Sequence, residues 1–131
     1  MLLVKTRIGP STIDGTELFA AEFIPKGTRV WDYRPDFDLD LTQDQIDALP
    51  EIAKRFALRY AYHSKFTGKW ILCADDGRFF NHSDKPNTTS IDSPDGLVNA
   101  EVASRDIQSG EELTTDYRSF DSDFERKMQM Y

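Results

Sequence analysis

Turn signals divide this chain into many short segments, and their spacing limits the fold more than any other feature. They lie at residues 9–12, 25–27, 86–87, 93–96 and 109–110. Strand-like runs rich in β-branched and aromatic residues lie at 2–8, 18–23, 28–33, 69–74, 88–92 and 97–103. Short strands separated by turns about 8–12 residues apart are typical of small antiparallel sheets. A length of 131 residues favours one domain. We therefore predict a mainly β single domain.

One segment departs from this pattern and is predicted to be helical. Thr42 with Gln45 three residues later forms the pattern of a capping box. That first helix ends before Pro50, which opens a second helix, since proline is tolerated in a first turn. Five residues of the second helix fall at helical spacing and form one apolar stripe, namely Ile52, Ala53, Phe56, Ala57 and Tyr60. The sequence thus predicts a short helical insert at about 42–60.

Composition excludes several classes of function. The formal net charge of -7 argues against a sequence-independent nucleic-acid binder and suits a basic protein or peptide as partner. The single cysteine, Cys73, is expected to be a small buried hydrophobe, which leaves no internal disulfide and no cysteine-based zinc site. No apolar run reaches the ~18 residues of a membrane span, and no signal peptide is recognised. We expect a cytoplasmic protein with no membrane segment.

The acidic residues before the helical insert and the two histidines do not match known metal sites. Asp36, Asp38 and Asp40 alternate as in a calcium loop, but Leu41 stands where such a loop needs glycine and Asp47 where it needs glutamate. These acids are expected to be solvated and to lead into the helical insert. The two histidines have no spaced partner ligands, so no metal site is predicted.

Residues 75–88 concentrate the polar chemistry of the chain. An apolar pair there precedes Asn81, His82 and Ser83, which either satisfy a turn or hold a polar ligand. His82 and Ser83 are adjacent, so in an extended chain they point apart and do not form a catalytic pair. A Gly-x-Ser-x-Gly elbow is absent. Asp75–Asp76 is read as a turn before Gly77 in preference to a general acid/base pair.

Three segments, in the right order, resemble the SET domain of protein-lysine methyltransferases. Residues 11–20, followed by Ile-Pro-Lys-Gly at 24–27, resemble the family's Gly-x-Gly-(Leu/Val)-Phe-Ala opening. Arg-Phe-Phe-Asn-His-Ser at 78–83, with Pro-Asn at 86–87, resembles its Arg-Phe-x-Asn-His-Ser…Pro-Asn motif. Gly-Glu-Glu-Leu-Thr-Thr-Asp-Tyr at 110–117 resembles Gly-Glu-Glu-(Leu/Ile)-Thr-x-Asp-Tyr. The short length and the lack of a cysteine-rich segment after the domain are similar to the small bacterial and viral members.

The resemblance implies a fold and a reaction. The fold is a β-clip of small curved sheets, whose C-terminal segment passes beneath a preceding loop in a knot-like arrangement. The activity is methyl transfer from S-adenosylmethionine to the side-chain amine of a protein lysine, by direct displacement. Lysine has a pKa near 10.4, so the amine must lose its proton first, and an apolar channel favours that loss.

The resemblance also assigns roles to residues of this chain. Tyr117 matches the catalytic tyrosine, whose hydroxyl orients the methyl group through weak C–H···O contacts. The implied cofactor-binding residues are Gly15, Thr16, Glu17, Leu18, Tyr60, Asn81, His82, Tyr117 and Phe120. For Tyr60 a role in core packing stays open, and Phe120 either covers the adenine or channel mouth or anchors the tail in the core.

Departures from the family pattern leave further questions. Glu17 stands in place of the second glycine of the opening motif, and Thr115 where many members have an aromatic residue. We divide the chain into a SET domain at 1–120 and a helical tail at 121–131. The lysine channel is closed by this tail, by a second subunit of a homodimer, or by the substrate. The alternative function is a non-catalytic SET-like module that binds a peptide or protein.

Overall fold

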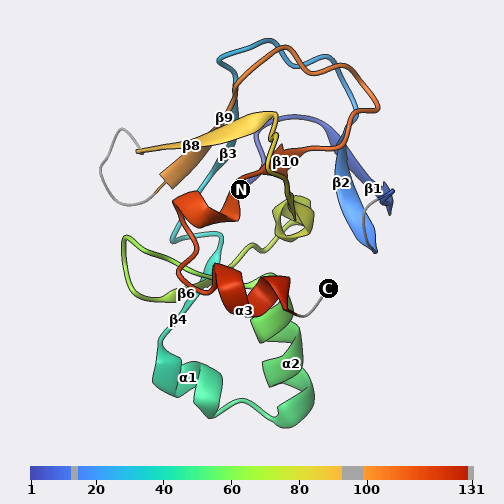
Figure 1. The fold of residues 1–131 in the computed structure, drawn as a ribbon. Helices are drawn as coiled ribbons and strands as arrows, with labels where there is room; N and C mark the ends of the chain where they lie inside the picture. The colour runs from blue at the N-terminus through green and yellow to red at the C-terminus, as the bar shows by residue number, and fades with distance from the viewer. Residues whose placement is uncertain (13–14, 93–98, 130–131) are drawn as a thin grey trace.

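Short strands pair into four small sheets, and the helices α1 (Gln43–Asp47) and α2 (Glu51–Tyr60) lie together at one end of the molecule (Figure 1). The computed structural model of the chain describes residues 1–12, 15–92 and 99–129. The sheets, in order of pairing, are β1 (Thr6–Pro10) with β2 (Thr16–Ala20); β3 (Arg29–Asp32) with β9 (Asn99–Ala103) and β8 (Thr88–Asp92); β4 (Leu39–Leu41) with β6 (Trp70–Leu72) and β5 (Tyr62–His63); and β10 (Thr114–Thr115) with β7 (Asn81–His82). The helices are α1 (Gln43–Asp47), α2 (Glu51–Tyr60) and α3 (Phe124–Met128), with 3-10 turns η1 (Asp76–Phe79) and η2 (Tyr117–Ser119). The prediction of a mainly β fold is confirmed.

The first strand begins and ends later in the chain than the strand predicted at 2–8. We expected a strand at 2–8 and a turn at 9–12, but β1 includes Gly9 and Pro10, which pair with β2. Pro10 can stand there because it ends an edge strand, where its missing N–H interrupts no ladder. Leu2 lies outside β1 and makes an isolated bridge to β3. The turn predicted at 93–96 lies outside the described residues.

The helical insert is confirmed, together with its capping box. The Gln45 amide N–H donates to Thr42 Oγ1 at 3.2 Å, and the Thr42 N–H donates to Gln45 Oε1 at 2.9 Å. The predicted apolar stripe of α2 is not buried along its whole length, because Ile52 is 85% exposed and Phe56 is 46% exposed. Ala57 is the residue of α2 that is buried, since α2 is covered on one side only.

One of the three aspartates before α1 is buried, contrary to expectation. Asp36, Asp38 and Asp40 were expected to be solvated, but Asp38 is buried. Its Oδ2 accepts from the N-terminal ammonium at 3.3 Å and from the Arg34 N–H at 2.9 Å, while Oδ1 accepts from the Ala74 N–H at 3.3 Å. These partners offset the cost of burying a carboxylate, so Asp38 ties the start of the chain to the segment that follows β6.

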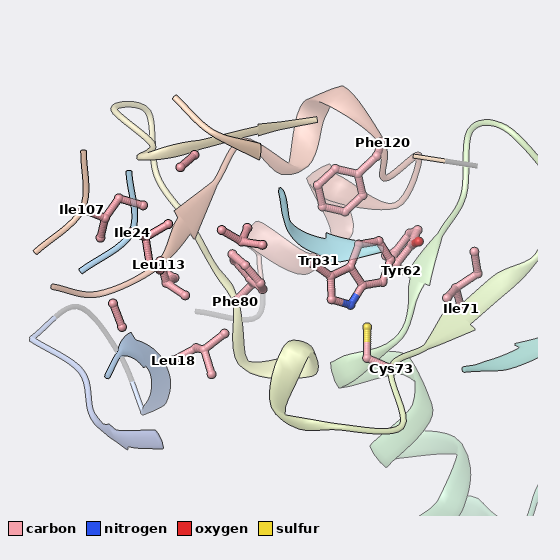
Figure 2. Close-up of a cluster of buried hydrophobic side chains, with 13 residues drawn as sticks. Leu18, Ile24, Trp31, Tyr62, Ile71, Cys73, Phe80, Ile107, Leu113 and Phe120 are labelled. Carbon is pink, nitrogen blue, oxygen red and sulfur yellow. The ribbon is translucent and has the colours of Figure 1, made fainter. Parts of the chain in front are cut away.

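Two apolar clusters hold the sheets and the insert. The larger lies between the small sheets (Figure 2), and each large side chain buried there contributes roughly 1.5–3 kcal/mol. Its members include Leu18, Ile24, Trp31, Tyr62, Ile71, Cys73, Phe80, Ile107, Leu113 and Phe120. The smaller cluster joins the helices to β6 and consists of Ile46, Ala57, Ala61 and Trp70. The expectation that Cys73 is buried is confirmed, and burial raises the pKa of its thiol to about 12.

The C-terminal part of the chain returns to the centre of the molecule. β10 pairs in parallel with β7, which places Thr114 opposite Asn81 and Thr115 opposite His82. Farther along, the Lys65 N–H donates to the Phe120 carbonyl at 3.0 Å. Residues 114–122 therefore contact both the β7 segment and the loop after β5. In the described part of the chain, no helix is both long enough and apolar enough to cross a membrane.

Candidate functional site

The parallel pair β7–β10 brings two motifs together although they are 35 residues apart in sequence. The Tyr117 N–H donates to His82 Nδ1 at 3.2 Å, and the two rings lie 5.6 Å apart. An accepting Nδ1 places the proton of a neutral His82 ring on Nε2. The Tyr117 hydroxyl in turn donates to the Phe80 carbonyl. Tyr117 is thus fixed at both its backbone and its hydroxyl end by the motif at 78–83.

A buried asparagine locks this junction. Asn87 is 3% exposed, its Oδ1 accepts from the Thr114 N–H at 2.9 Å, and its Nδ2 donates to the Glu112 carbonyl at 2.7 Å. The Asn87 N–H itself donates to Thr114 Oγ1 at 3.2 Å. One amide side chain therefore satisfies two backbone groups that strand pairing leaves free. Asn87 of the Pro-Asn pair at 86–87 therefore joins two segments in addition to forming a turn.

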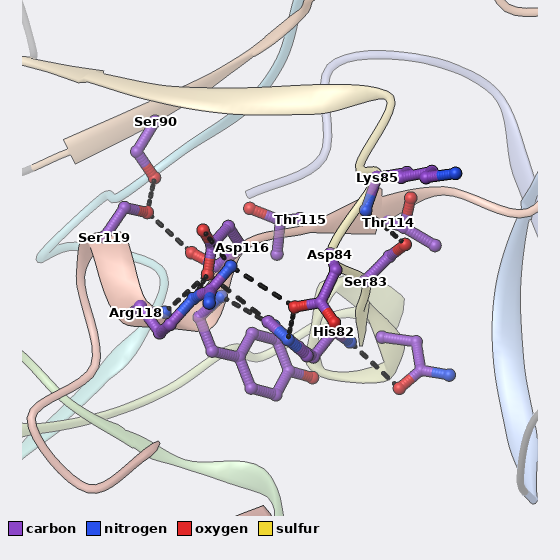
Figure 3. A network of polar contacts seen from close by, with 12 residues as sticks. His82, Ser83, Asp84, Lys85, Ser90, Thr114, Thr115, Asp116, Arg118 and Ser119 are labelled. Atoms are coloured by element: carbon purple, nitrogen blue, oxygen red, sulfur yellow. Dashed lines mark hydrogen bonds and ion pairs between the residues drawn. The ribbon is translucent and has the colours of Figure 1, made fainter. Parts of the chain in front are cut away.

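Charged side chains surround the outer face of His82 (Figure 3). Arg118 Nε donates to Asp116 Oδ1 at 2.8 Å, and its Nη2 lies 3.3 Å from Asp84 Oδ1. Asp84 Oδ1 also lies 3.4 Å from His82 Nε2. The hydrogen bond from Arg118 lowers the pKa of Asp116. This network orients the His82 ring and covers it from solvent on one side.

Two adjoining cavities meet at Tyr117. The larger, of about 210 Å³, is bounded by Gly15, Thr16 and Glu17 on one side. The narrower, of about 50 Å³, is lined largely by aromatic rings, among them Trp31 and Tyr62. The residues common to both cavities are Tyr60, Arg78, Phe80, Tyr117 and Lys127. A ligand in one cavity would therefore touch the same tyrosine as a ligand in the other.

The predicted site residues are distributed unevenly around these cavities. Gly15, Thr16, Glu17, Tyr60 and Tyr117 line the larger cavity, and Phe120 lines the narrower one. The others, Leu18, Asn81 and His82, line neither of the two: Leu18 is fully buried in the core, and Asn81 and His82 lie in β7 beside Tyr117.

Sequence reasoning missed several residues that line the cavities. Arg78, Phe79 and Phe80 directly precede Asn81 in the motif at 78–83, so the motif itself could have identified them as site residues. Arg59 lies beside Tyr60 on α2, and Lys127 comes from the tail. Nothing in the sequence distinguished Lys127 from Arg126, the other cation of the tail.

The residues around the larger cavity fit a zwitterionic ligand with further polar groups. Its lining includes the carboxylate of Glu17 and three cations, those of Arg59, Arg78 and Lys127. Gly15 has φ of +61°, a left-handed conformation that glycine adopts without strain, so its backbone can approach a ligand. Arg78 Nε and Asn81 Nδ2 are buried, and within residues 1–12, 15–92 and 99–129 neither donor has an acceptor. No group of three or more acidic, histidine or cysteine side chains in the same part of the chain could hold a metal ion.

Comparisons with known proteins concern the fold and the family of the chain. The structure of a putative histone methyltransferase from Plasmodium falciparum is similar with a TM-score of 0.60, over 88% of this chain and 95% of that chain. The sequence identity is 23%, so this likeness concerns the fold. A search of curated proteins gives no match. The SET domain profile matches residues 15–118, which include the β7–β10 junction, Tyr117 and most of the residues that line the two cavities. The chain therefore belongs to the SET domain family, whose members are typically protein-lysine methyltransferases.

Proposed function

We propose that the protein transfers a methyl group from S-adenosylmethionine to the side-chain amine of a lysine in a protein substrate. The observation that carries this proposal is the meeting of two cavities at Tyr117, one polar enough for a zwitterion and one narrow and aromatic. Two reactants, one in each cavity, would both lie against Tyr117. Alignment of this kind can supply a large part of the rate enhancement.

The larger cavity is the proposed cofactor site. Arg59 would pair with the carboxylate of the methionine group and Glu17 with its ammonium. Arg78, which lines this cavity, has a buried Nε that would gain an acceptor. S-adenosylmethionine, when bound, supplies a methyl group activated by an adjacent sulfonium. In this arrangement Glu17 assists binding, although it replaces a glycine of the family motif.

The narrower cavity is the proposed lysine channel. Trp31, Tyr62 and Phe120 give it apolar walls, which disfavour an ammonium and favour a neutral amine. Tyr117 lies where the channel meets the cofactor site and is the proposed catalytic residue. Its hydroxyl can orient the methyl group by weak C–H···O contacts, since its ring is held by His82.

The tail at 121–131 is proposed to close the channel of the SET domain at 1–120. Phe124 of α3 packs on His82, with ring centroids 4.8 Å apart. Lys127 is 5% exposed and lies 5.6 Å above the Tyr117 ring. Arg126 Nη2 donates to the Leu58 carbonyl of α2 at 3.0 Å, which ties the tail to the insert. These contacts favour closure by the tail over closure by a second subunit.

The proposed substrate is a basic segment of a protein, and the proposed compartment is the cytoplasm. A net charge of -7 attracts a lysine-rich chain and repels nucleic acid. Cofactor binding distinguishes this enzyme from the alternative, a non-catalytic module that binds a peptide or protein.

Calorimetry with S-adenosylmethionine and with its demethylated product tests the cofactor site. Both ligands should bind the wild-type protein, and Arg59→Ala should weaken binding about ten-fold because the proposed charged hydrogen bond to the cofactor carboxylate is lost. Arg55→Ala is the matched control on the same helix, since Arg55 pairs with Glu51 at the surface and lines neither cavity. No heat of binding at millimolar ligand would reject the enzyme and leave the binding module.

A further inference from the structure

The narrow cavity contains a buried carboxylate that no family motif singles out. Glu101 of β9 is 3% exposed and lines this cavity. Its Oε2 accepts from Thr88 Oγ1 at 2.9 Å and from Thr115 Oγ1 at 3.1 Å, and its Oε1 accepts from Ser90. All three donors are neutral, and within the described part of the chain no cation pairs with Glu101. Burial raises the pKa of this carboxyl although the hydrogen bonds act to lower it.

The hydroxyl groups leave Glu101 with spare capacity to accept a proton. Each carboxylate oxygen offers about two acceptor directions, and Oε1 uses one, for Ser90. The Thr88 hydroxyl also lies 2.8 Å from the Thr114 carbonyl, and its single proton can go to one acceptor at a time. Glu101 is therefore held in place without being saturated. Asp121, the other carboxylate of the cavity, is already paired with Lys127 Nζ at 2.9 Å.

Two serines, neither of which lines the cavity, connect Glu101 to the surface. Ser90 Oγ contacts Glu101 Oε1 and lies 3.2 Å from Ser119 Oγ (Figure 3). Ser119 is exposed. Glu101 thus lies between the candidate lysine channel and a short chain of hydroxyls that ends at the surface.

We propose that Glu101 accepts the proton of the incoming substrate lysine and that Ser90 and Ser119 pass this proton to water. The N–H bond of the ammonium breaks, its electron pair stays on nitrogen as the nucleophilic lone pair, and an O–H bond forms on Glu101. Glu101 then donates to Ser90 Oγ, the proton of Ser90 passes to Ser119 Oγ, and the proton of Ser119 goes to solvent as the hydroxyls reverse. The proposal rests on the proposed function, because it concerns the lysine that the narrow cavity receives.

The surroundings of Glu101 favour this transfer. A channel with few waters destabilises both the ammonium and the carboxylate, so the neutral amine and the neutral acid gain relative to water. The other titratable groups that line the same cavity are Tyr60, Tyr62, Cys73, Arg78, Tyr117, Asp121 and Lys127. Burial raises the pKa values of Tyr62 and Cys73, so these groups stay neutral near pH 7. Strands β8 and β10 face Glu101 with hydroxyls rather than charges.

The test measures kcat/KM for methylation of a lysine peptide from about pH 6.5 to about pH 9.5, below the lysine pKa near 10.4. Glu101→Gln should lower kcat/KM about a hundred-fold at the acidic end, and the loss should shrink as lysine deprotonates in solution. Ser90→Ala should show a smaller loss with the same trend. Glu111→Gln is the matched control, since Glu111 pairs with Arg105 away from both cavities. Calorimetry should give Glu101→Gln the cofactor affinity of the wild type.

The outcomes separate this proposal from the proposed function. An active wild type whose Glu101→Gln variant is equally active, or is impaired equally at every pH, would reject the role of Glu101 alone. Reduced cofactor affinity in that variant would also reject it. A wild type that methylates no lysine would reject the methyltransferase and this role with it. If Glu101→Gln does not fold, Ser90→Ala takes its place in the test. A ratio of its kcat/KM to that of the wild type that does not change with pH would then reject the proposal.

Discussion

The β7–β10 junction and the helical insert are built in opposite ways. At the junction, polar groups are buried and joined over long distances in sequence, as in the bonds of Asn87 to Glu112 and Thr114. In the insert at 42–60, the capping-box bonds join residues three apart at the surface, and apolar residues such as Ile52 face solvent. A buried polar group without a partner is costly, whereas an exposed apolar residue costs little. The junction therefore tolerates few substitutions, and the insert can vary.

The largest expected effect is at the junction. Asn87→Ala leaves the Thr114 N–H and the Glu112 carbonyl without partners, and should lower the free energy of unfolding by about 3 kcal/mol. Gln43→Ala is the counterpart in the insert, where it removes the acceptor of Trp70 Nε1 at a half-buried position and should cost about 1 kcal/mol. Denaturant unfolding measures both. Equal losses would remove the proposed difference between the two regions.

A smaller effect depends on pH. Since the pKa of Glu101 is raised in the folded protein, the folded state holds its proton more tightly than the unfolded chain does. The contribution of Glu101 to stability is thus full below its usual pKa of 4.5 and is lost as pH rises through the raised value. Stability of Glu101→Gln relative to wild type should rise over that range, by at most about 1.4 kcal/mol per pH unit. Thermal unfolding across the range checks this, and a constant difference would contradict it.

The smallest effect is expected on the outer face of α2. Ile52→Ser should change the free energy of unfolding by no more than about 0.5 kcal/mol, because Ile52 is 85% exposed. Ala57→Ser, on the buried face of the same helix, is the matched comparison and should cost more. A loss at Ile52 as large as that at Ala57 would mean that another part of the protein covers this face.

The sequence predicted local features well and long-range ones poorly. The capping box of Thr42 and Gln45 involves neighbours three residues apart, so the residue types alone define it. The stripe on α2 was misjudged at Ile52, since periodicity shows which residues share a face but not whether anything packs there. The burial of Asp38 depends on its bonds to the chain start and to Ala74, which no local pattern contains.

The site residues were also predictable where they lie in local motifs and not where the fold alone brings them together. The motifs at 78–83 and 110–117 marked Asn81, His82 and Tyr117, and the parallel pairing of β7 with β10 brings these residues together. Lys127 and Glu101 line the narrow cavity without belonging to any motif. Their positions follow from the path of the tail and the register of β9, which only the three-dimensional structure reveals.

The most direct test of the proposed function is methyl transfer by the intact chain. The protein should be incubated with S-adenosylmethionine and a panel of basic proteins, and the products examined by mass spectrometry. We predict a methylated lysine with the wild type, and a loss of about a hundred-fold or more in rate with Tyr117→Phe at unchanged cofactor affinity. Equal methylation by both proteins, or none by the wild type with cofactor bound, would contradict the assignment of Tyr117 and of the two cavities that meet there.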